Sequence, residues 1–491
     1  MKKIKLISLI LALVMVIGLF AGCGKPGADG DEGDTTAAPV DNTNYKYGTI
    51  HGITWTFGGQ ADRANATEVQ REEERNAEYF QDTGNTRQCV AFTYNYDTVG
   101  ALFEGGQMPT VFPVQATEPA RLVEAGWGRD ISNCIETVGL DLSDFNQTIL
   151  ATYMDENGGV YGLPYFAYSM CLVVNGALYK EAGLVDENGE PVAPTTWEEV
   201  IEQANTIKEK TGKGGLALQC SDREGGWIFT NIAWNFGADL CVWDEDAGKF
   251  VSGINTPETI AALEWYKEAC WSEGLAGTPS TDSRNSTQSM LKAGECAIIM
   301  GATDFADAMT GEMVDGMDPQ DIYYFNMPAG PTGLQYNLMG GAGYWFSSSA
   351  TDEEVIAVLE YLLNYGFWTQ EWTEDGKAAD YQDWEDRVAQ NKLVLPSFPV
   401  YNAPYQAERE AEMLAAMADL YNYEAQFKTV FDFAQKEGTM HTEEECDVQN
   451  LYQQLTNILQ EIATDPNADV AALAAQADAS YTDLLNIAQG G

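Results

Sequence analysis

The side chains that most often carry nucleophilic catalysis are present in this chain, but their spacing does not suit that chemistry. There are only two histidines, His51 and His441, which lie far apart in the sequence, and no GxSxG motif occurs. A serine nucleophile needs a histidine base beside it, and zinc sites often use several histidines. The sequence therefore disfavours a serine hydrolase and a multi-histidine zinc centre.

Carboxylates are the other group that could do chemistry. The chain has 75 Asp and Glu residues against 26 Lys and Arg, a formal net charge of −49. A glycoside hydrolase places two carboxyl groups about 5–10 Å apart, but with so many acids some pair reaches that separation by chance. The same charge repels nucleic-acid phosphates and excludes nucleic acid as a partner. Anionic ligands are disfavoured unless a local basic pocket exists.

Two acidic stretches, residues 186–190 (DENGE) and 244–248 (DEDAG), have closely spaced oxygen ligands. Neither has the DxDxDG spacing with a distal Glu that a calcium loop requires. Both are interpreted as polar turns, and we expect no metal and no other cofactor.

The first residues indicate export. Residues 1–5 are basic, residues 6–20 are an apolar run too short for a membrane span, and Ala21-Gly22 leads into Cys23. The segment resembles the lipobox of bacterial lipoproteins, with Phe20 where Leu is usual. The resemblance implies cleavage of signal peptide 1–22, lipidation of Cys23 and a location on the extracellular face of the cell membrane. The alternative is a plain secretory signal with an incidental cysteine.

Residues 23–46 are rich in Gly, Asp, Thr and Pro, and we expect them to form a flexible tether. Eight cysteines follow without a CxxC or a short framework, so their pairing cannot be deduced from the sequence. Cys171 and Cys296 sit in apolar runs, which favours buried free thiols.

Short apolar runs alternate with helical patterns, which is typical of an α/β protein. Thr196 with Glu199, and Thr351 with Glu354, predict helix starts by capping box, and Thr256 precedes a proline at the first helical position. Residues 403–487 are almost purely helical in pattern. The expected strands are 53–57, 89–94, 110–114, 171–175, 215–220, 297–300, 322–326 and 343–347.

Five stretches in order span about half of the chain. They are 103–112 (FEGGQMPTVF), 158–184 (GGVYGLPYFAY and CLVVNGALYKEAGL), 194–200 (PTTWEEV), 294–301 (GECAIIMG) and 327–347 (MPAGPTGLQYNLMGGAGYWFS). Together they resemble the extracellular solute-binding proteins of ABC importers, family 1, whose members mostly bind sugars. Two stretches depart from the family pattern at single positions, since Thr110 stands where Asp is usual and Gly176 where Lys is usual.

The resemblance implies a two-lobe periplasmic-binding-protein-like fold with hinge strands and a helical C-terminal region. The crossings should fall near 163–166, 340–345 and 395–401. Lobe 1 would hold residues 47–163 and 343–395, and lobe 2 would hold residues 164–342 and 396–491. Ligand would bind in the cleft between the lobes, where strand ends face each other.

A cleft for a neutral sugar needs aromatic faces for C–H surfaces and planar polar groups for hydroxyls. Trp227 follows a strand in a Gly-rich polar stretch, and Trp345 lies at the second crossing, so both are candidates. Tyr165, beside Phe166, lies at the first crossing and faces either the cleft or hinge packing. Trp197, Trp265 and Trp271 fit helix stripes and are assigned to the core.

The polar candidates for hydrogen bonds to ligand hydroxyls stand at strand ends, and ordinary solvent exposure is the alternative for each. They are Asp62, Arg63, Gln115, Asp222, Arg223 and Asp304.

These features predict a lipid-anchored monomer that captures a neutral carbohydrate, with an oligosaccharide favoured, and delivers it to an ABC transporter permease. No catalytic residue is expected. The rival prediction is a lipid-anchored extracellular glycoside hydrolase. A cell-wall adhesion protein is a third class, but it leaves the two-lobe pattern without a purpose.

Overall fold

The computed structural model describes residues 50–59, 66–310, 316–365, 368–369, 371–398 and 400–490. Contacts divide the chain into residues 1–41 and a compact unit of residues 42–491. The predicted signal peptide and tether, with Cys23, lie outside the described residues, and so do Asp62 and Arg63.

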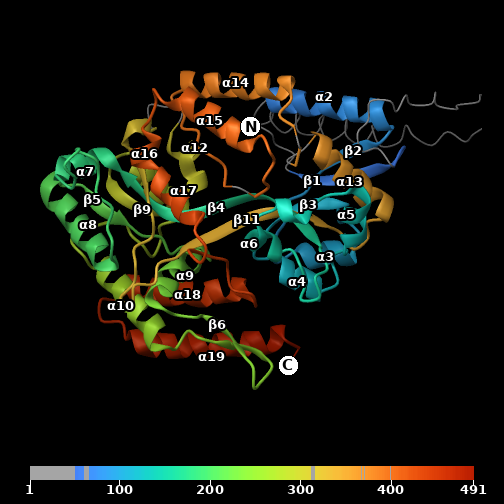
Figure 1. Cartoon of the computed structure of the whole chain (residues 1–491). Helices are drawn as coiled ribbons and strands as arrows, with labels where there is room; N and C mark the ends of the chain where they lie inside the picture. Colours follow the sequence, from blue (N-terminus) through green and yellow to red (C-terminus); the bar gives the residue numbers. More distant parts are fainter. Residues whose placement is uncertain are drawn as a thin grey trace, which may run out of the picture. The chain divides into compact units, whose positions relative to one another are not determined.

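The folded unit is built on one mixed sheet in which eight strands follow one another (Figure 1). In spatial order these are β2 (Thr86–Ala91), β1 (Thr54–Gly59), β3 (Val111–Gln115), β11 (Asn337–Phe346), β4 (Gly162–Asn175), β9 (Cys296–Ala302), β5 (Gly214–Ala217) and β8 (Leu275–Ala276). Strand β10 (Ile322–Phe325) also pairs with β4, and β12 (Met440–His441) pairs with β11. A separate hairpin joins β6 (Cys241–Asp244) to β7 (Lys249–Ser252).

Strands β4 and β11 connect the two halves of this sheet. The first part of β4 pairs antiparallel with β11, with Met339 opposite Ser169, and its last residues pair with β9 and β10. Strand β11 in turn pairs with β3 at its other edge. We call the half around β1, β2 and β3 the first lobe and the half around β5, β8 and β9 the second lobe.

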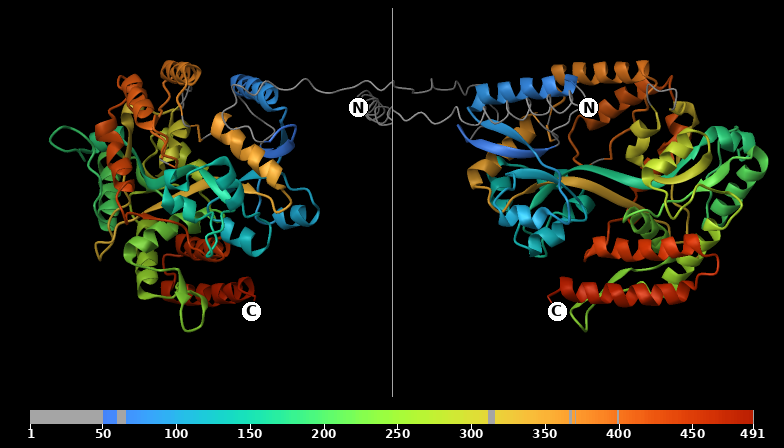
Figure 2. Two further views of the ribbon diagram at one scale, coloured as in Figure 1. Left: turned by 45° about the vertical axis from the view of Figure 1, so that its right-hand side comes forward. Right: turned by 180° about the vertical axis from the view of Figure 1, so that it is seen from behind.

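Helices cover both lobes, as the two views of Figure 2 show. The first lobe carries α2 (Ala66–Thr83), α3 (Val99–Glu104), α4 (Pro119–Glu124), α5 (Ser132–Val138), α6 (Gln147–Ala151) and α13 (Asp352–Tyr365). Helices α7 (Gly176–Ala182), α8 (Trp197–Thr211), α9 (Glu224–Phe236), α10 (Pro257–Cys270), α11 (Arg284–Lys292) and α12 (Ala306–Met309) belong to the second.

The C-terminal part is helical, as expected from its sequence pattern. It contains α14 (Glu374–Ala389), α15 (Gln406–Met417), α16 (Tyr423–Gln426), α17 (Lys428–Ala434), α18 (Val448–Thr464) and α19 (Val470–Ala488). Single 3₁₀ turns are η2 (Leu142–Asp144), η3 (Thr303–Phe305) and η4 (Pro319–Asp321). No helix within the described residues is both long enough and apolar enough to cross a membrane.

The predicted helix starts are confirmed, but only one of the two predicted capping boxes is complete. The Thr351 hydroxyl accepts from the Glu354 backbone at 3.2 Å, and the Glu354 carboxylate accepts from the Thr351 backbone at 2.8 Å, a complete capping box. At α8 the Thr196 hydroxyl accepts from the Glu199 backbone, but the Glu199 carboxylate accepts from Thr195 instead. These local bonds satisfy donors that the first helical turn leaves unpaired.

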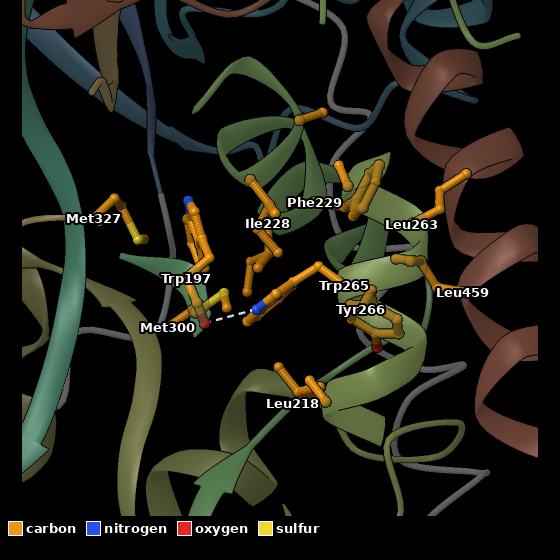
Figure 3. Packing of buried hydrophobic residues seen from close by; sticks show 14 of the residues in the cluster. Trp197, Leu218, Ile228, Phe229, Leu263, Trp265, Tyr266, Met300, Met327 and Leu459 are labelled. Atoms are coloured by element: carbon orange, nitrogen blue, oxygen red, sulfur yellow. Dashed lines mark hydrogen bonds between the residues drawn. The ribbon is translucent and has the colours of Figure 1, made fainter. Parts of the chain in front are cut away.

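The largest core lies in the second lobe, where α8, α9, α10 and α18 pack together (Figure 3). Trp197 and Trp265 are buried there, with ring centroids 4.8 Å apart in an edge-on arrangement. The Trp265 indole donates a hydrogen bond of 2.7 Å to the Trp197 carbonyl oxygen. Both residues are therefore core, as predicted. Trp271 is not, because it caps the end of α10 and is 49% exposed.

Three smaller clusters complete the interior. Trp55, Phe346, Trp368 and Tyr401 belong to a cluster in the first lobe. Trp384 and Leu393 pack in another cluster with Cys171 and Ile299 of the second lobe. The third holds Phe112, Trp345, Phe398 and others beside β11. The predicted lobe boundaries stay predictions.

The strand predictions are largely correct in place and less so in length. Strand β11 begins at Asn337 rather than near 343, because Asn337 and Leu338 pair with β12 and residues 339–342 pair with β4. The acidic stretches at 186–190 and 244–248 are turns, in which Asp186 and Asp244 accept backbone N–H groups at 2.8–3.0 Å.

Candidate functional site

Loops of the first lobe meet helix starts of the second beside the connecting strands. The Gln449 side-chain amide, in the first turn of α18, donates to the Glu118 carboxylate at 3.2 Å. Arg223, just before α9, lies 3.6 Å from Asp97, in the loop that follows β2. Both pairs bridge the lobes, so this region is one contact between the two halves.

Four residues form a corner at this junction, which we call the Trp227 corner: Tyr168, Trp227, Glu443 and Tyr452. The Trp227 indole nitrogen donates to Oε1 of Glu443 at 3.0 Å. The Tyr168 and Trp227 rings lie 6.3 Å apart in an edge-on arrangement. Trp227 and Tyr168 are both partly buried.

Glycines bring these elements close enough to form the corner. A Cβ at Gly226 would lie 2.1 Å from the Tyr452 carbonyl oxygen, so only glycine lets α9 approach α18 this closely. A Cβ at Gly340 would lie 2.2 Å from the Tyr168 hydroxyl oxygen. The Tyr168 ring therefore lies across the backbone of β11, and a larger residue there would displace it.

Burial gives the Glu443 carboxyl an unusual pKa. Desolvation, with Glu118 nearby, raises that pKa to about 8, although hydrogen bonding to Trp227 and the neighbouring Tyr452 oppose the rise. The pKa of Tyr168 and that of Tyr452 are also raised by burial, and Glu443 raises both further. Glu444, the next residue, faces Trp234 instead, and burial raises its pKa to about 7.

Each arginine at the junction has a carboxylate partner. Arg121 lies 3.7 Å from Glu118, and Arg284 lies 3.3 Å from Glu224. Arg223 is paired with Asp97, as described above, so all three are compensated. Arg121 and Arg223 also lie over the Tyr96 ring, 4.1 Å and 5.2 Å from its centroid.

Two further carboxyls face the same region. Asp304 lies in the 3₁₀ turn η3 that follows β9, and desolvation of its carboxyl raises its pKa, which the charge of Arg284 opposes. Asp447 precedes α18 with a left-handed backbone at φ 48°, and its carboxylate accepts from the Asn450 amide at 2.9 Å. Desolvation raises the pKa of Asp447 as well. The region therefore has an excess of acid.

The aromatic candidates from the sequence separate in the structure. Trp227 forms part of the corner. Trp345 is fully buried, donates a hydrogen bond to the Trp127 carbonyl oxygen at 3.3 Å and packs against Tyr161, so it lies in the core. Tyr165 stacks on Tyr344, with ring centroids 4.4 Å apart.

Tyr165 instead lines a groove of about 1540 Å³, whose other aromatic residues include Trp368, Trp372 and Tyr405. None of the four corner residues lines this groove. Tyr165 and Tyr168 differ in position because of the local geometry of β4. Phe166, which is 37% exposed, and Tyr168 share one face of β4, whereas a bulge opposite Ala342 and Gly343 sets Tyr165 apart.

The polar candidates are also placed. Arg223 lies at the junction and Asp304 faces it, whereas Gln115 is exposed at the end of β3. Asp222 is exposed with a left-handed φ of 51°, which turns the chain into α9. Asp62 and Arg63 stay predictions.

Tyr168, Glu118 and Glu443 were missed by the sequence analysis. Tyr168 carries a usable signal, because it lies two residues after Phe166 on a strand already placed at the first crossing. Glu443 is one of three consecutive glutamates in a polar segment, and nothing local distinguishes it from its exposed neighbour Glu445.

The raised pKa of Glu443 predicts a pH dependence of stability. The folded protein binds this proton more tightly than the unfolded chain, so the free energy of unfolding falls as pH rises from about 4.5 to about 8. Near pH 4.5, Glu443→Gln should melt at the same temperature as the parent. Above about pH 8, it should melt at a higher temperature than the parent. Glu445→Gln should follow the parent throughout. Identical pH profiles for the parent and Glu443→Gln would mean that this carboxyl is not buried.

Comparisons with known proteins agree on one class. The family described as bacterial extracellular solute-binding protein matches residues 77–366. The diacetylchitobiose binding protein DasA of Streptomyces coelicolor is 25% identical over 228 residues, which is 46% of this chain and 48% of DasA. The sn-glycerol-3-phosphate-binding periplasmic protein UgpB of Brucella abortus is 25% identical over 45% of this chain and 48% of UgpB. The chain thus spans about half the length of the curated relatives it matches.

Solved structures match over more of the chain. The GacH receptor of Streptomyces glaucescens, solved unliganded and with acarbose, has a TM-score of 0.59 at 18% identity, covering 88% of this chain and 98% of GacH. Maltose-bound MalE3 of T. maritima has a TM-score of 0.61 at 17% identity, covering 88% of this chain and 100% of MalE3. UgpB of Mycobacterium tuberculosis, in complex with glycerophosphocholine, has a TM-score of 0.62 at 17% identity, covering 89% of this chain and 99% of UgpB.

These structural similarities establish the two-lobe fold of periplasmic binding proteins, as predicted from the sequence. The family match extends over more than half of the chain, from α2 to the end of α13. The chain belongs to the bacterial extracellular solute-binding protein family.

Proposed function

We propose that this protein captures a carbohydrate between its two lobes and delivers it to the permease of an ABC transporter. The observation that carries the proposal is the Trp227 corner, where a half-buried indole and a tyrosine ring on the connecting strand stand at the junction of the lobes. An aromatic face binds the C–H surface of a sugar ring, and nearby carboxylates accept hydrogen bonds from its hydroxyls.

The charge at the junction favours a carbohydrate over an anion. An anionic ligand needs a basic group that is free to bind it. Arg121, Arg223 and Arg284 each already have a carboxylate within 3.7 Å. A ligand phosphate would have to compete with Glu118, Asp97 and Glu224 for these guanidinium groups. The glycerol phosphate named for the UgpB relatives is therefore not the ligand that we propose here.

Closure of the lobes supplies the mechanism. The bonds Gln449–Glu118 and Arg223–Asp97 exist only when the lobes are together. A ligand that touches both lobes adds contacts to the closed form alone, and so raises its population. The closed form would then present one defined surface to the permease.

One observation favours the rival function. Burial and the charge of Glu118 raise the pKa of Glu443 to about 8, and a carboxyl whose pKa is raised in part by a second acid resembles the acid–base pair of a glycoside hydrolase. We therefore expect no release of reducing ends from oligosaccharides incubated with the protein. Sustained release that is lost in Glu443→Gln would make the protein a hydrolase.

Attachment to the membrane is proposed from the sequence alone. Cys23 would carry the lipid, and residues 23–46 would form a flexible tether between the membrane and the folded, monomeric part of the protein. Cys23→Ser should move the protein from the membrane fraction to the medium when the two are separated by centrifugation. An unchanged membrane fraction would contradict lipidation at Cys23.

Trp227 provides the direct test of the binding site. With a saccharide selected by thermal shift from a panel of oligosaccharides, Trp227→Ala should weaken binding by about 1–3 kcal/mol in titration calorimetry, because a stacked ring loses its apolar partner. Trp243→Ala is the matched control, since Trp243 is 47% exposed on the β6–β7 hairpin. Equal affinity in the parent and Trp227→Ala would remove Trp227 from the site.

A further inference from the structure

Two guanidinium groups, one from each lobe, lie over the Tyr96 ring. Tyr96 is in the loop between β2 and α3 of the first lobe, and its ring centroid is 4.1 Å from Cζ of Arg121 and 5.2 Å from Cζ of Arg223. Arg121 belongs to α4 of the same lobe, whereas Arg223 is the residue just before α9 in the second lobe. An arginine within about 6 Å of an aromatic centroid is attracted by the electrons of the ring. Tyr96 therefore joins the lobes through a cation–π contact.

Arg223 also has an ion-pair partner beside the same ring. Its Nη2 lies 3.6 Å from Oδ1 of Asp97, the residue that follows Tyr96 in the chain. The side chains of Arg223 and Asp97 are 34% and 66% exposed, so water and salt screen this ion pair. One side chain of the second lobe thus contacts two adjacent residues of the first lobe, a ring and a charge.

Opposite charges meet across the junction in the reverse direction as well. Asp447, just before α18, is close enough to Arg121 of the first lobe for their charges to interact. Desolvation raises the pKa of Asp447, and the charge of Arg121 opposes this rise. Burial raises the pKa of the Tyr96 hydroxyl, and the charge of Asp447 raises it further. Each lobe therefore contributes a cation and an anion to the contact around Tyr96.

All of these contacts join one lobe directly to the other. The closed form gains them whether or not the cleft is occupied, and the open form loses them. A protein whose closed form is populated beforehand binds its ligand more tightly, because less of the binding free energy goes into closing the lobes. Residues of such a contact can set the affinity without touching the ligand.

We propose that Arg223, Tyr96 and Asp97 form a clasp that holds the lobes closed and raises ligand affinity in this way. We call these three residues the Arg223 clasp. They are positioning residues, since they act on the ligand only through the equilibrium between the lobes. Arg223 was predicted from the sequence to bond ligand hydroxyls, and in this proposal its partners are Tyr96 and Asp97 instead. The inference rests on lobe closure in the proposed function and names the residues that set its equilibrium.

Salt gives the clasp a signature that a neutral ligand lacks. Contacts between a neutral carbohydrate and the protein depend little on ionic strength, whereas an exposed ion pair weakens as salt is added. The chain has a formal net charge of −49, and salt also screens the repulsion between acidic surfaces, which favours closure. These two effects oppose each other in the parent. The informative quantity is therefore the difference between the parent and a variant without the ion pair, which should shrink as salt rises.

Small-angle X-ray scattering of the ligand-free protein tests the clasp, because closure of two lobes lowers the radius of gyration. The protein is measured at about 0.02 M and at about 0.5 M salt, where screening is weak and strong respectively. Arg223→Gln and Asp97→Asn each remove one charge of the ion pair. Tyr96→Leu removes the aromatic face, and Tyr96→Phe keeps it.

Arg387→Gln is the matched control. The Arg387 side chain is 30% exposed, close to the 34% of Arg223, and its ion-pair partner Asp383 lies 2.9 Å away on the same helix, α14. This variant changes the net charge as Arg223→Gln does, but the ion pair that it removes lies within one helix. Melting temperatures check that each variant is folded. If Arg223→Gln does not fold, Asp97→Asn makes the same comparison from an exposed position of the other lobe.

At low salt, Arg223→Gln, Asp97→Asn and Tyr96→Leu should have a larger radius of gyration than the parent, because the closed form loses stabilising contacts. For the two charge variants this gap should narrow at high salt. Tyr96→Phe and Arg387→Gln should match the parent. With a saccharide selected by thermal shift, Arg223→Gln should bind about three- to tenfold more weakly than the parent at low salt, the size expected for one ion pair with a ring contact.

The clasp is overturned if Arg223→Gln and Asp97→Asn scatter as the parent does at low salt, if the gap is the same at both salt concentrations, or if Tyr96→Leu matches the parent. It is also overturned if Arg223→Gln binds the saccharide more weakly with unchanged scattering, because Arg223 would then contact the ligand and carbohydrate capture would stand. If no saccharide binds, the carbohydrate proposal fails, and the scattering of the ligand-free variants still decides the clasp.

Discussion

A single strand, β4, makes hydrogen bonds in both halves of the sheet, and the arrangement of the lobes depends on it. Its 14 residues pair first with β11 and then with β9 and β10, so the backbone crosses between the lobes without a break. Strand β11 can lie beside it only because glycines leave room for rings. Gly340 accommodates Tyr168, and Gly343 accommodates Tyr153. The rings that these glycines admit include Tyr168, which belongs to the Trp227 corner.

This constraint explains how much of the fold was predictable. The helix starts at Thr196, Thr256 and Thr351 depend on bonds within one turn, so the local sequence determines them. The start of β11 depends on pairing with strands that are distant in the sequence. Trp271 lies at the end of a helix stripe, and sequence pattern did not show that the helix end reaches solvent. Long-range pairing, rather than propensity, decided these cases.

The candidate site was predicted only in part for a related reason. Trp227 was found because its Gly-rich stretch follows a strand, and Trp345 was chosen by the same reasoning, yet Trp345 is buried against Tyr161. The role of Glu443 depends on the packing of α9 against α18, which brings Trp227 to a residue far away in the sequence. Charge at a site is a property of the assembled junction. The acidic composition of the chain agrees with an acidic junction, but composition alone does not show where in the fold the acids gather.

The account rests on the claim that ligand binds at the junction beside Trp227 and between the lobes. A crystal structure of the protein with a bound saccharide tests this most directly. The account predicts a sugar ring in contact with Tyr168 and Trp227, and contacts to the loop around Glu118. A saccharide bound instead in the groove lined by Tyr165, Trp368 and Trp372, with the Trp227 corner untouched, would contradict it.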